Sequence, residues 1–230
     1  MKIIISILFI FLVSGGSLFA DTTELARSYC QIGEYKKCAE YYQKMVIERN
    51  DPIAANNLAS LYLDGKGVEK NGIMAVELFK ASILYGVNDQ VTKQYKGAPE
   101  TSLGWIYLTG EYPGVNRDAK KALMWTLKAT NYGHTNAYSN LALMYATGFG
   151  VETDYVVSVT NLIKSVEAFH KIHNWILNKD DKWKTFLVDG STEIWSARRL
   201  YWKAIKTGDP YYLGKLRLIR DKLKQEEVFK

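Results

Sequence analysis

Hydrophobic and small residues recur at helical spacing in the middle of the chain, and the first clear example runs from residue 53 to residue 68. Leu58 and Tyr62 stand four residues apart and predict one large apolar stripe on a helix. Small residues form a second, tightly packing stripe beside it: Ala54, Ala55 and Ala59. Gly65 follows the last apolar turn, where a helix commonly ends in a left-handed residue. Asn71 then offers an N-cap, so the pattern predicts two consecutive helices.

The same pattern occurs in three segments, at 58–68, 103–115 and 141–151. Each segment has a Leu, a Tyr four residues later, a Gly three residues after the Tyr, and then Gly-Val. The Tyr and the two glycines of each segment are Tyr62, Gly65 and Gly67; Tyr107, Gly110 and Gly114; and Tyr145, Gly148 and Gly150. Repeated residues with repeated neighbours indicate a structural turn between helices.

The second half of each unit repeats as well. Eight residues after the second glycine come the small residues Ala75, Ala122 and Ser158, and a later copy of this half runs from Ala197 to Gly208. Each unit therefore reads as a helix hairpin with an apolar side that it cannot cover alone. Such units must stack, which predicts an all-α solenoid of antiparallel helix hairpins.

The pattern resembles the Sel1-like repeat, a relative of the tetratricopeptide repeat with a glycine-bearing loop between its helices. The resemblance covers about 53–208 and implies a Sel1-like, tetratricopeptide-like superhelix. The fourth copy is degenerate, because its first helix near Lys171–Asn178 lacks the Tyr and the glycine pair, although its second helix is clear at 194–208. The expected organisation is a signal peptide at 1–20, a tetratricopeptide-like capping hairpin at 21–52, repeats at 53–89, 98–134, 135–170 and 171–208, an insertion at 90–97, and a capping helix at 209–230.

The first twenty residues have the layout of a secretory signal peptide. One Lys precedes a continuous apolar run from Ile3 to Val13, and small residues then lead to Ala20, the expected last residue before cleavage. An uncleaved anchor is the alternative, since Ile3 to Ala20 could almost span a bilayer. No later segment of the sequence is apolar over such a length. We therefore expect a periplasmic or secreted protein.

Cys30 and Cys38 are the two cysteines of the chain. An even number of cysteines in an exported protein makes a disulfide the default hypothesis. The resemblance to a tetratricopeptide unit places Cys30 late in the first helix and Cys38 at the small-residue position of the second, so that a tight turn can bring the two sulfurs together. Two buried free thiols acting as small apolar residues are the alternative.

The formal net charge of +6 is concentrated at the C-terminal end. Residues 198–230 carry ten Lys and Arg against four Asp and Glu, whereas residues 21–197 carry nineteen basic and twenty acidic side chains. No nucleic-acid partner is expected, because the chain has no basic face with a known binding motif. The last segment instead predicts an amphipathic capping helix whose buried stripe is Leu213, Leu216, Ile219 or Arg220, and Leu223.

No motif for catalysis or for binding a cofactor or a metal emerges. The loop Asp64-Gly-Lys-Gly lacks both the spacing and the strand of a phosphate-binding loop, and Lys residues occupy positions where a calcium loop needs oxygen ligands. His170 and His173 are spaced for one helix face with Glu167, but a zinc site there has no fourth ligand. We expect no enzyme, no cofactor and no metal.

The tetratricopeptide alignment implies a concave groove lined by the first helix of each unit. It places Trp105 in that groove together with its equivalents Arg27, Ser60 and Leu143. Four residues earlier on the helices of Ser60, Trp105 and Leu143 it places Asn56, Thr101 and Ser139. Polar side chains around one aromatic anchor could hold an extended peptide by hydrogen bonds to its backbone. A solvated inner face without a dedicated ligand is the alternative.

The leading hypothesis is an exported helical-repeat protein that binds a protein or peptide partner through its concave face, as an adaptor or scaffold in the bacterial envelope. The resemblance implies two alternatives. One is a periplasmic immunity protein that neutralises a secreted toxin. The other is a β-lactam-binding or β-lactam-hydrolysing enzyme like the cysteine-rich Sel1-like proteins, but their staple positions carry no cysteine here, as at Ile83 and Thr130.

Overall fold

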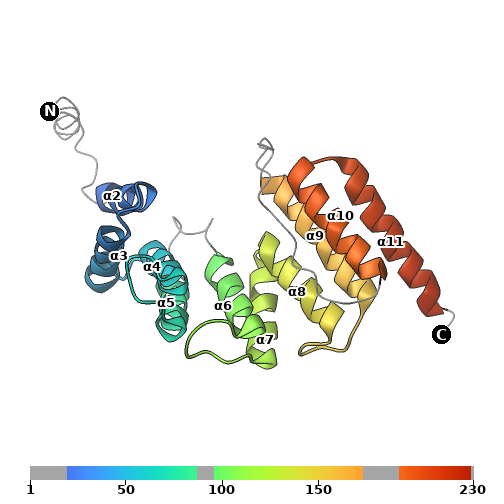
Figure 1. Cartoon of the computed structure of the whole chain (residues 1–230), viewed down its shortest axis with the longest axis horizontal. Helices are drawn as coiled ribbons and strands as arrows, with labels where there is room; N and C mark the ends of the chain where they lie inside the picture. The colour runs from blue at the N-terminus through green and yellow to red at the C-terminus, as the bar shows by residue number, and fades with distance from the viewer. Residues whose placement is uncertain (1–19, 87–95, 173–191, 229–230) are drawn as a thin grey trace.

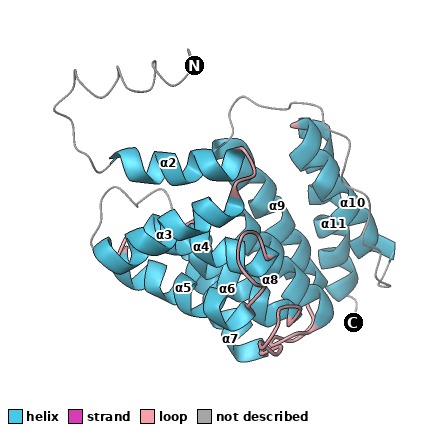
Figure 2. Cartoon of the chain, turned by 60° about the vertical axis from the view of Figure 1, so that its left-hand side comes forward, coloured by secondary structure: helices cyan, strands magenta, loops and turns pink. Residues whose placement is uncertain are grey.

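The computed structural model describes residues 20–86, 96–172 and 192–228, and all the regular structure within them is helical (Figure 2). The labels follow Figure 1. The helices are α2 Ala20–Gln31, α3 Tyr35–Arg49, α4 Pro52–Asp64, α5 Gly72–Tyr85, α6 Ala98–Thr109, α7 Ala119–Asn131, α8 Thr135–Thr147, α9 Tyr155–Ile172, α10 Thr192–Thr207 and α11 Pro210–Val228. None of these helices has both the length and the apolar character needed to cross a membrane. The expected signal peptide lies outside the described residues up to position 19.

Consecutive helices pack as antiparallel pairs, and the pairs follow one another along an arc from the N-terminal end to α11 (Figure 1). The helices α4 and α6 lie on the inner side of this arc, and α5 and α7 lie on the outer side. Each pair also packs on the next through α3 with α4, α5 with α6, and α7 with α8. This arrangement confirms the predicted all-α solenoid.

The helix bounds also bear on the individual units. The second unit begins with α6 at Ala98, and the helices α10 and α11 occupy the positions expected for the second helix of the fourth unit and for the capping helix. The helix α9 continues to Ile172, two residues beyond the expected end of the third unit. The first helix of the fourth unit is expected near residues 171–178, and the described residues stop at 172 before resuming at 192.

The glycine loop ends one helix and starts the next, as the sequence predicts. Gly65 is the C-cap of α4 with φ of 70°, and Gly110 and Gly148 end α6 and α8 in the same left-handed conformation. The Asn71 side chain accepts a hydrogen bond from the backbone N–H of Met74 at 3.0 Å and so caps α5. Caps of this kind contribute roughly 1 kcal/mol each.

The repeated Tyr contributes its backbone as well as its ring. The N–H of the residue that caps the second helix donates to the carbonyl of this Tyr in all three units: Asn71 to Tyr62 at 3.0 Å, Asp118 to Tyr107 at 2.9 Å, and Asp154 to Tyr145 at 3.0 Å. The bond closes the loop between the two helices of each unit and fixes where the second helix begins.

The second glycine of each loop packs on the preceding unit. A Cβ at Gly67 would overlap the Tyr35 carbonyl at the start of α3, and a Cβ at Gly114 would stand 2.6 Å from the Ile73 side chain at the start of α5. Gly150 has the same relation to Ala119 at the start of α7. The loop therefore sets how neighbouring units stack, in addition to how two helices of one unit meet.

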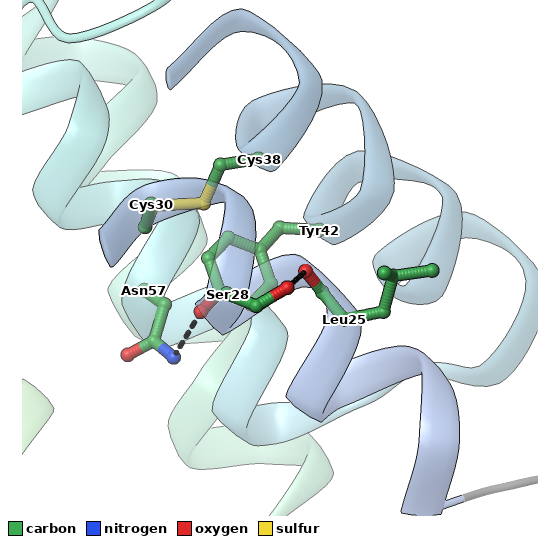
Figure 3. Close-up of a disulfide and its surroundings, with 6 residues drawn as sticks. All are labelled: Leu25, Ser28, Cys30, Cys38, Tyr42 and Asn57. Atoms are coloured by element: carbon green, nitrogen blue, oxygen red, sulfur yellow. Dashed lines mark hydrogen bonds between the residues drawn. A yellow bond between two sulfur atoms is a disulfide. The ribbon is translucent and has the colours of Figure 1, made fainter. Parts of the chain in front are cut away.

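The first and last pairs close the array. Cys30 at the end of α2 and Cys38 near the start of α3 form a disulfide, with their Cα atoms 5.3 Å apart (Figure 3). Figure 3 also shows the Asn57 side chain of α4, which donates to the Tyr42 hydroxyl of α3 at 3.2 Å. At the other end, Leu216 and Leu223 of α11 are buried and Leu213 and Ile219 are partly buried, which agrees with the predicted stripe.

Candidate functional site

The first helices of the units carry the side chains predicted to line the groove. Arg27 lies on α2, Asn56 and Ser60 on α4, Trp105 on α6, and Ser139 on α8. Ser60 and Trp105 are exposed, whereas Arg27, Asn56 and Ser139 are partly buried. Because α4 and α6 lie on the inner side of the solenoid, Asn56, Ser60 and Trp105 lie on helices of that side.

Trp105 is the large aromatic side chain of this surface. Its side chain is 37% exposed, although it sits on a helix whose neighbouring residues Gly104 and Ile106 are buried. The indole makes a hydrogen bond with the Tyr112 side chain. Burial raises the pKa of Tyr112 above its usual value, and this hydrogen bond partly opposes the rise. The side-chain nitrogen of Lys70 lies over the Tyr112 ring, 5.5 Å from the ring centroid. Trp105 therefore has Tyr112 as a hydrogen-bond partner while 37% of the residue stays exposed.

Three of the polar groups predicted to line the groove have hydrogen-bond partners that are near neighbours in sequence. The Ser60 hydroxyl donates to the Asn56 carbonyl at 3.2 Å, and the Asn56 amide donates to Asn57 Oδ1 at 3.3 Å. Arg27 pairs with Glu24 at 3.0 Å, and the two side chains are 42% and 68% exposed. Exposed local bonds of this kind contribute little to stability, so these groups can exchange them for bonds to a ligand.

Thr101 does not join this surface, which corrects the prediction for that residue. Its side chain is buried, and its hydroxyl donates to the Gly97 carbonyl at 2.6 Å. Because the hydroxyl proton is used in this bond, the hydroxyl oxygen accepts from Nδ1 of His134 at 2.9 Å. Burial lowers the pKa of His134, so the neutral ring is the favoured form. Thr101 and His134 therefore join α6 to the start of α8, whose N-cap is His134.

A pocket of about 130 Å³ lies where the first and second units meet. The residues that line it come from α4, α5 and α6, from both ends of the segment 87–95 and from the C-cap of α7: Pro52, Ile53, Asn56, Ser82, Ile83, Gly86, Lys96, Pro99, Glu100 and Tyr132. Asn56 thus belongs both to the predicted groove and to this pocket. The sequence alone does not reveal this pocket, because the pocket depends on how two successive units are spaced.

Glu100 is the buried acidic group of the pocket, with 5% of the residue exposed. Its Oε2 atom accepts from the backbone N–H of Gly97 at 3.1 Å and so caps the start of α6. Burial raises the pKa of Glu100, while its hydrogen bonds to backbone N–H groups and the positive charges of Lys128 and Lys96 act in the opposite direction. A carboxylate and an ammonium group at one pocket can bind polar groups of either sign.

Hydroxyl groups that could serve as nucleophiles are engaged in the fold. Ser82 donates to the Pro52 carbonyl at 2.7 Å, and Ser165 donates to the Thr135 carbonyl at 2.8 Å. Within the part of the chain that the structure describes, no three His, Cys, Asp or Glu side chains gather as a metal site would require. The histidine pair of the sequence analysis falls on side chains outside that part.

The fold defines the chain as an α-solenoid of helix hairpins. The family model for the Sel1 repeat matches residues 52–84, 101–134 and 135–168, which are the three units recognised by their glycine loops. The chain belongs to the Sel1 repeat family.

Two solved structures are similar to this chain. One is a Sel1 repeat protein from Oxalobacter formigenes, with a TM-score of 0.57 and 19% sequence identity, over 93% of this chain and 77% of that one. The other is c5321, described as a protective antigen of uropathogenic Escherichia coli strains with an SLR fold, with a TM-score of 0.30 and 16% identity over 90% of this chain and 57% of that one. The first likeness supports the fold.

Proposed function

We propose that this Sel1 repeat protein binds a protein or peptide partner along the inner side of its solenoid. Sel1 repeats generally mediate protein interactions. The observation that carries the proposal for this chain is the exposed Trp105 on the inner helix α6, together with Ser60 and Asn56 on the inner helix α4, whose hydrogen bonds are local and exchangeable. An aromatic side chain held in place and surrounded by polar groups is a common anchor of protein interfaces.

The pocket at the junction of the first two units supplies a second anchor point. Asn56 connects it to the surface around Ser60, so an extended segment that follows α4 reaches both. The pocket is large enough for one side chain, and Glu100 and Lys96 offer polar partners at its wall. The partner therefore places a polar side chain in the pocket and packs an apolar group against Trp105.

The site of action is the bacterial envelope or the space outside it. The disulfide between Cys30 and Cys38 supports this location, because such bonds persist in oxidising compartments. The expected signal peptide agrees with it. The partner is then another exported or envelope protein, for which this chain acts as an adaptor or scaffold.

The test is capture of partners from a detergent-solubilised envelope extract, followed by measurement of the dissociation constant with the purified partner. Trp105→Ala is expected to weaken binding at least about tenfold, the usual effect at an interface anchor. Tyr155→Ala is the matched control, because Tyr155 is an aromatic residue of similar exposure on α9, a second helix. Equal affinities for the wild type and Trp105→Ala, with helicity unchanged, would show that the inner side is not the binding surface.

The proposal treats the protein as a binding protein without enzymatic activity. The engaged serine hydroxyls support this. A nitrocefin assay on the purified protein tests the β-lactamase alternative directly. Turnover above that of a heat-inactivated sample would contradict the proposal.

A further inference from the structure

The last two helices expose large apolar side chains that the core does not use. Trp202 on α10 is 50% exposed, and Tyr211 and Leu218 on α11 are 60% and 63% exposed. On α11 the exposed residues Tyr211, Lys215 and Leu218 stand at helical spacing and share one side of the helix. Leu216 and Leu223 face the core instead, so the exposed groups are additional to the packing of α11.

A series of ring contacts links Tyr211 of α11 to α10. Lys203 of α10 lies over the Tyr212 ring at 5.5 Å, the rings of Tyr212 and Tyr211 meet edge to face at 5.4 Å, and Lys215 lies over the Tyr211 ring at 5.3 Å. We call the surface formed by Lys203, Tyr211, Tyr212, Lys215 and Leu218, together with the exposed Trp202 next to Lys203 in sequence on α10, the basic–aromatic patch. It lies at the C-terminal end of the array, on the outermost pair of helices (Figure 1).

The charge around the patch is strongly positive. Residues 198–225 carry nine Lys and Arg side chains and two acidic ones. Both acidic groups are engaged, since Asp209 accepts from the Tyr211 N–H at 2.9 Å and Asp221 pairs with Arg220 at 2.8 Å. Glu167 of α9 pairs with Arg217 at 2.8 Å, away from the Lys side chains of the patch. A net positive charge remains on these two helices, because residues 192–228 carry nine Lys and Arg against five Asp and Glu.

We propose that the basic–aromatic patch is a docking surface for an anionic phospholipid membrane. Lys side chains bind anionic head groups electrostatically, while Trp and Tyr rings lie favourably at the boundary between head groups and acyl chains. The exposed Leu218 adds an apolar contact that a purely electrostatic partner does not need. Because the apolar side of α11 stays in the core, the protein lies on the membrane and does not insert this helix into it.

Membrane lipid accounts for this patch better than nucleic acid does. The Cys30–Cys38 disulfide indicates an oxidising compartment, where membranes surround the protein. The patch also lies on different helices from the inner surface of the proposed function. Membrane docking at α10 and α11 leaves that surface open to a partner.

The test is flotation of the disulfide-bonded protein with phosphatidylcholine vesicles, with and without phosphatidylglycerol. The protein is used without residues 1–20, because that apolar segment would itself bind lipid. The described core contains no residue before Ala26, so the fold should not need the segment that is removed. Circular dichroism checks that the shortened protein is folded. We expect binding only to the vesicles with phosphatidylglycerol, and weakening of that binding by salt.

Two variants assign the binding to the patch. Lys203→Glu/Lys215→Glu is expected to lower the partition coefficient by about tenfold or more, and Trp202→Ser/Leu218→Ser to lower it several-fold at unchanged charge. Lys36→Glu/Lys120→Glu makes the same change in net charge at exposed positions on α3 and α7 and is expected to bind nearly as the wild type does.

Three results would overturn the proposal. One is equal binding to vesicles with and without phosphatidylglycerol. Another is equal loss of binding in the patch variant and the control variant. The third is binding to a double-stranded DNA oligonucleotide or to polyglutamate at protein concentrations that give no vesicle binding, which would assign the patch to another acidic polymer.

Discussion

Gly67 lies directly against the start of the helix that precedes its own unit, so that a Cβ at this position would stand 2.6 Å from the Lys36 nitrogen and closer still to the Tyr35 carbonyl oxygen. The backbone at Gly67 also has a positive φ of 72°. Two independent requirements therefore act on one residue. The left-handed conformation disfavours any side chain, and the close approach of another backbone leaves no room for one.

Gly67→Ala is expected to destabilise the protein by about 3 kcal/mol, because the strain of a left-handed alanine, about 1 kcal/mol, adds to an overlap with the backbone that only a shift of the neighbouring unit can relieve. Gly33→Ala is the matched control: φ is 83°, but no atom lies within 4 Å of the added Cβ. It should cost only about 1 kcal/mol. Chemical denaturation followed by circular dichroism measures both, and equal losses would contradict the role of the contact.

The two glycines of each loop illustrate what the sequence can predict. The first glycine follows an apolar helix turn, so its left-handed C-cap could be inferred from local pattern alone. The contact of the second glycine could not, because its neighbours lie one unit earlier and differ in type: Tyr35, Ile73 and Ala119. Repetition showed that the second glycine matters without showing what it touches.

The groove residues show the same limit. Asn56, Thr101 and Ser139 hold equivalent positions in three units, yet Thr101 is buried while the others are partly exposed. The difference comes from His134, the N-cap of α8, whose ring bonds to the Thr101 hydroxyl. An alignment of units carries no information about contacts between units, and for this reason the pocket beside Glu100 also went unpredicted.

Thr126→Val is expected to leave stability unchanged or to raise it by about 1 kcal/mol. The Thr126 hydroxyl is fully buried against Gly104 and has no hydrogen-bond partner, so a methyl group in its place removes an unfavourable buried polar atom. Thr101→Val provides the contrast, because it breaks two hydrogen bonds and leaves His134 Nδ1 unpaired. A loss of about 1–3 kcal/mol is expected there. Similar midpoints of thermal unfolding for the two variants would contradict these assignments.

The disulfide is expected to stabilise the first hairpin by about 2–3 kcal/mol, the value for a closed loop of this short length. Cys30→Ala/Cys38→Ala should lower the unfolding midpoint accordingly, and dithiothreitol should lower that of the wild type but not that of the variant. Mass spectrometry after treatment with iodoacetamide checks the bond itself. Alkylation of both cysteines in the native, unreduced protein would show that they are free thiols.

Glu100→Gln is expected to raise stability at neutral pH and to have little effect near pH 4. Burial raises the pKa of Glu100 in the folded state above its ordinary value of 4.5, so the folded protein holds this proton more tightly than the unfolded chain does. Stability from this group is therefore fully present below about pH 4.5 and is lost as the pH rises through the raised pKa. Gln cannot ionise, and its side-chain oxygen can still accept from the Gly97 N–H.

Thermal unfolding between pH 4 and pH 8 measures the effect, with Glu77→Gln as an exposed control whose only described partner is Lys80. A difference between Glu100→Gln and the wild type that stays constant with pH would show that the ionisation of Glu100 does not contribute.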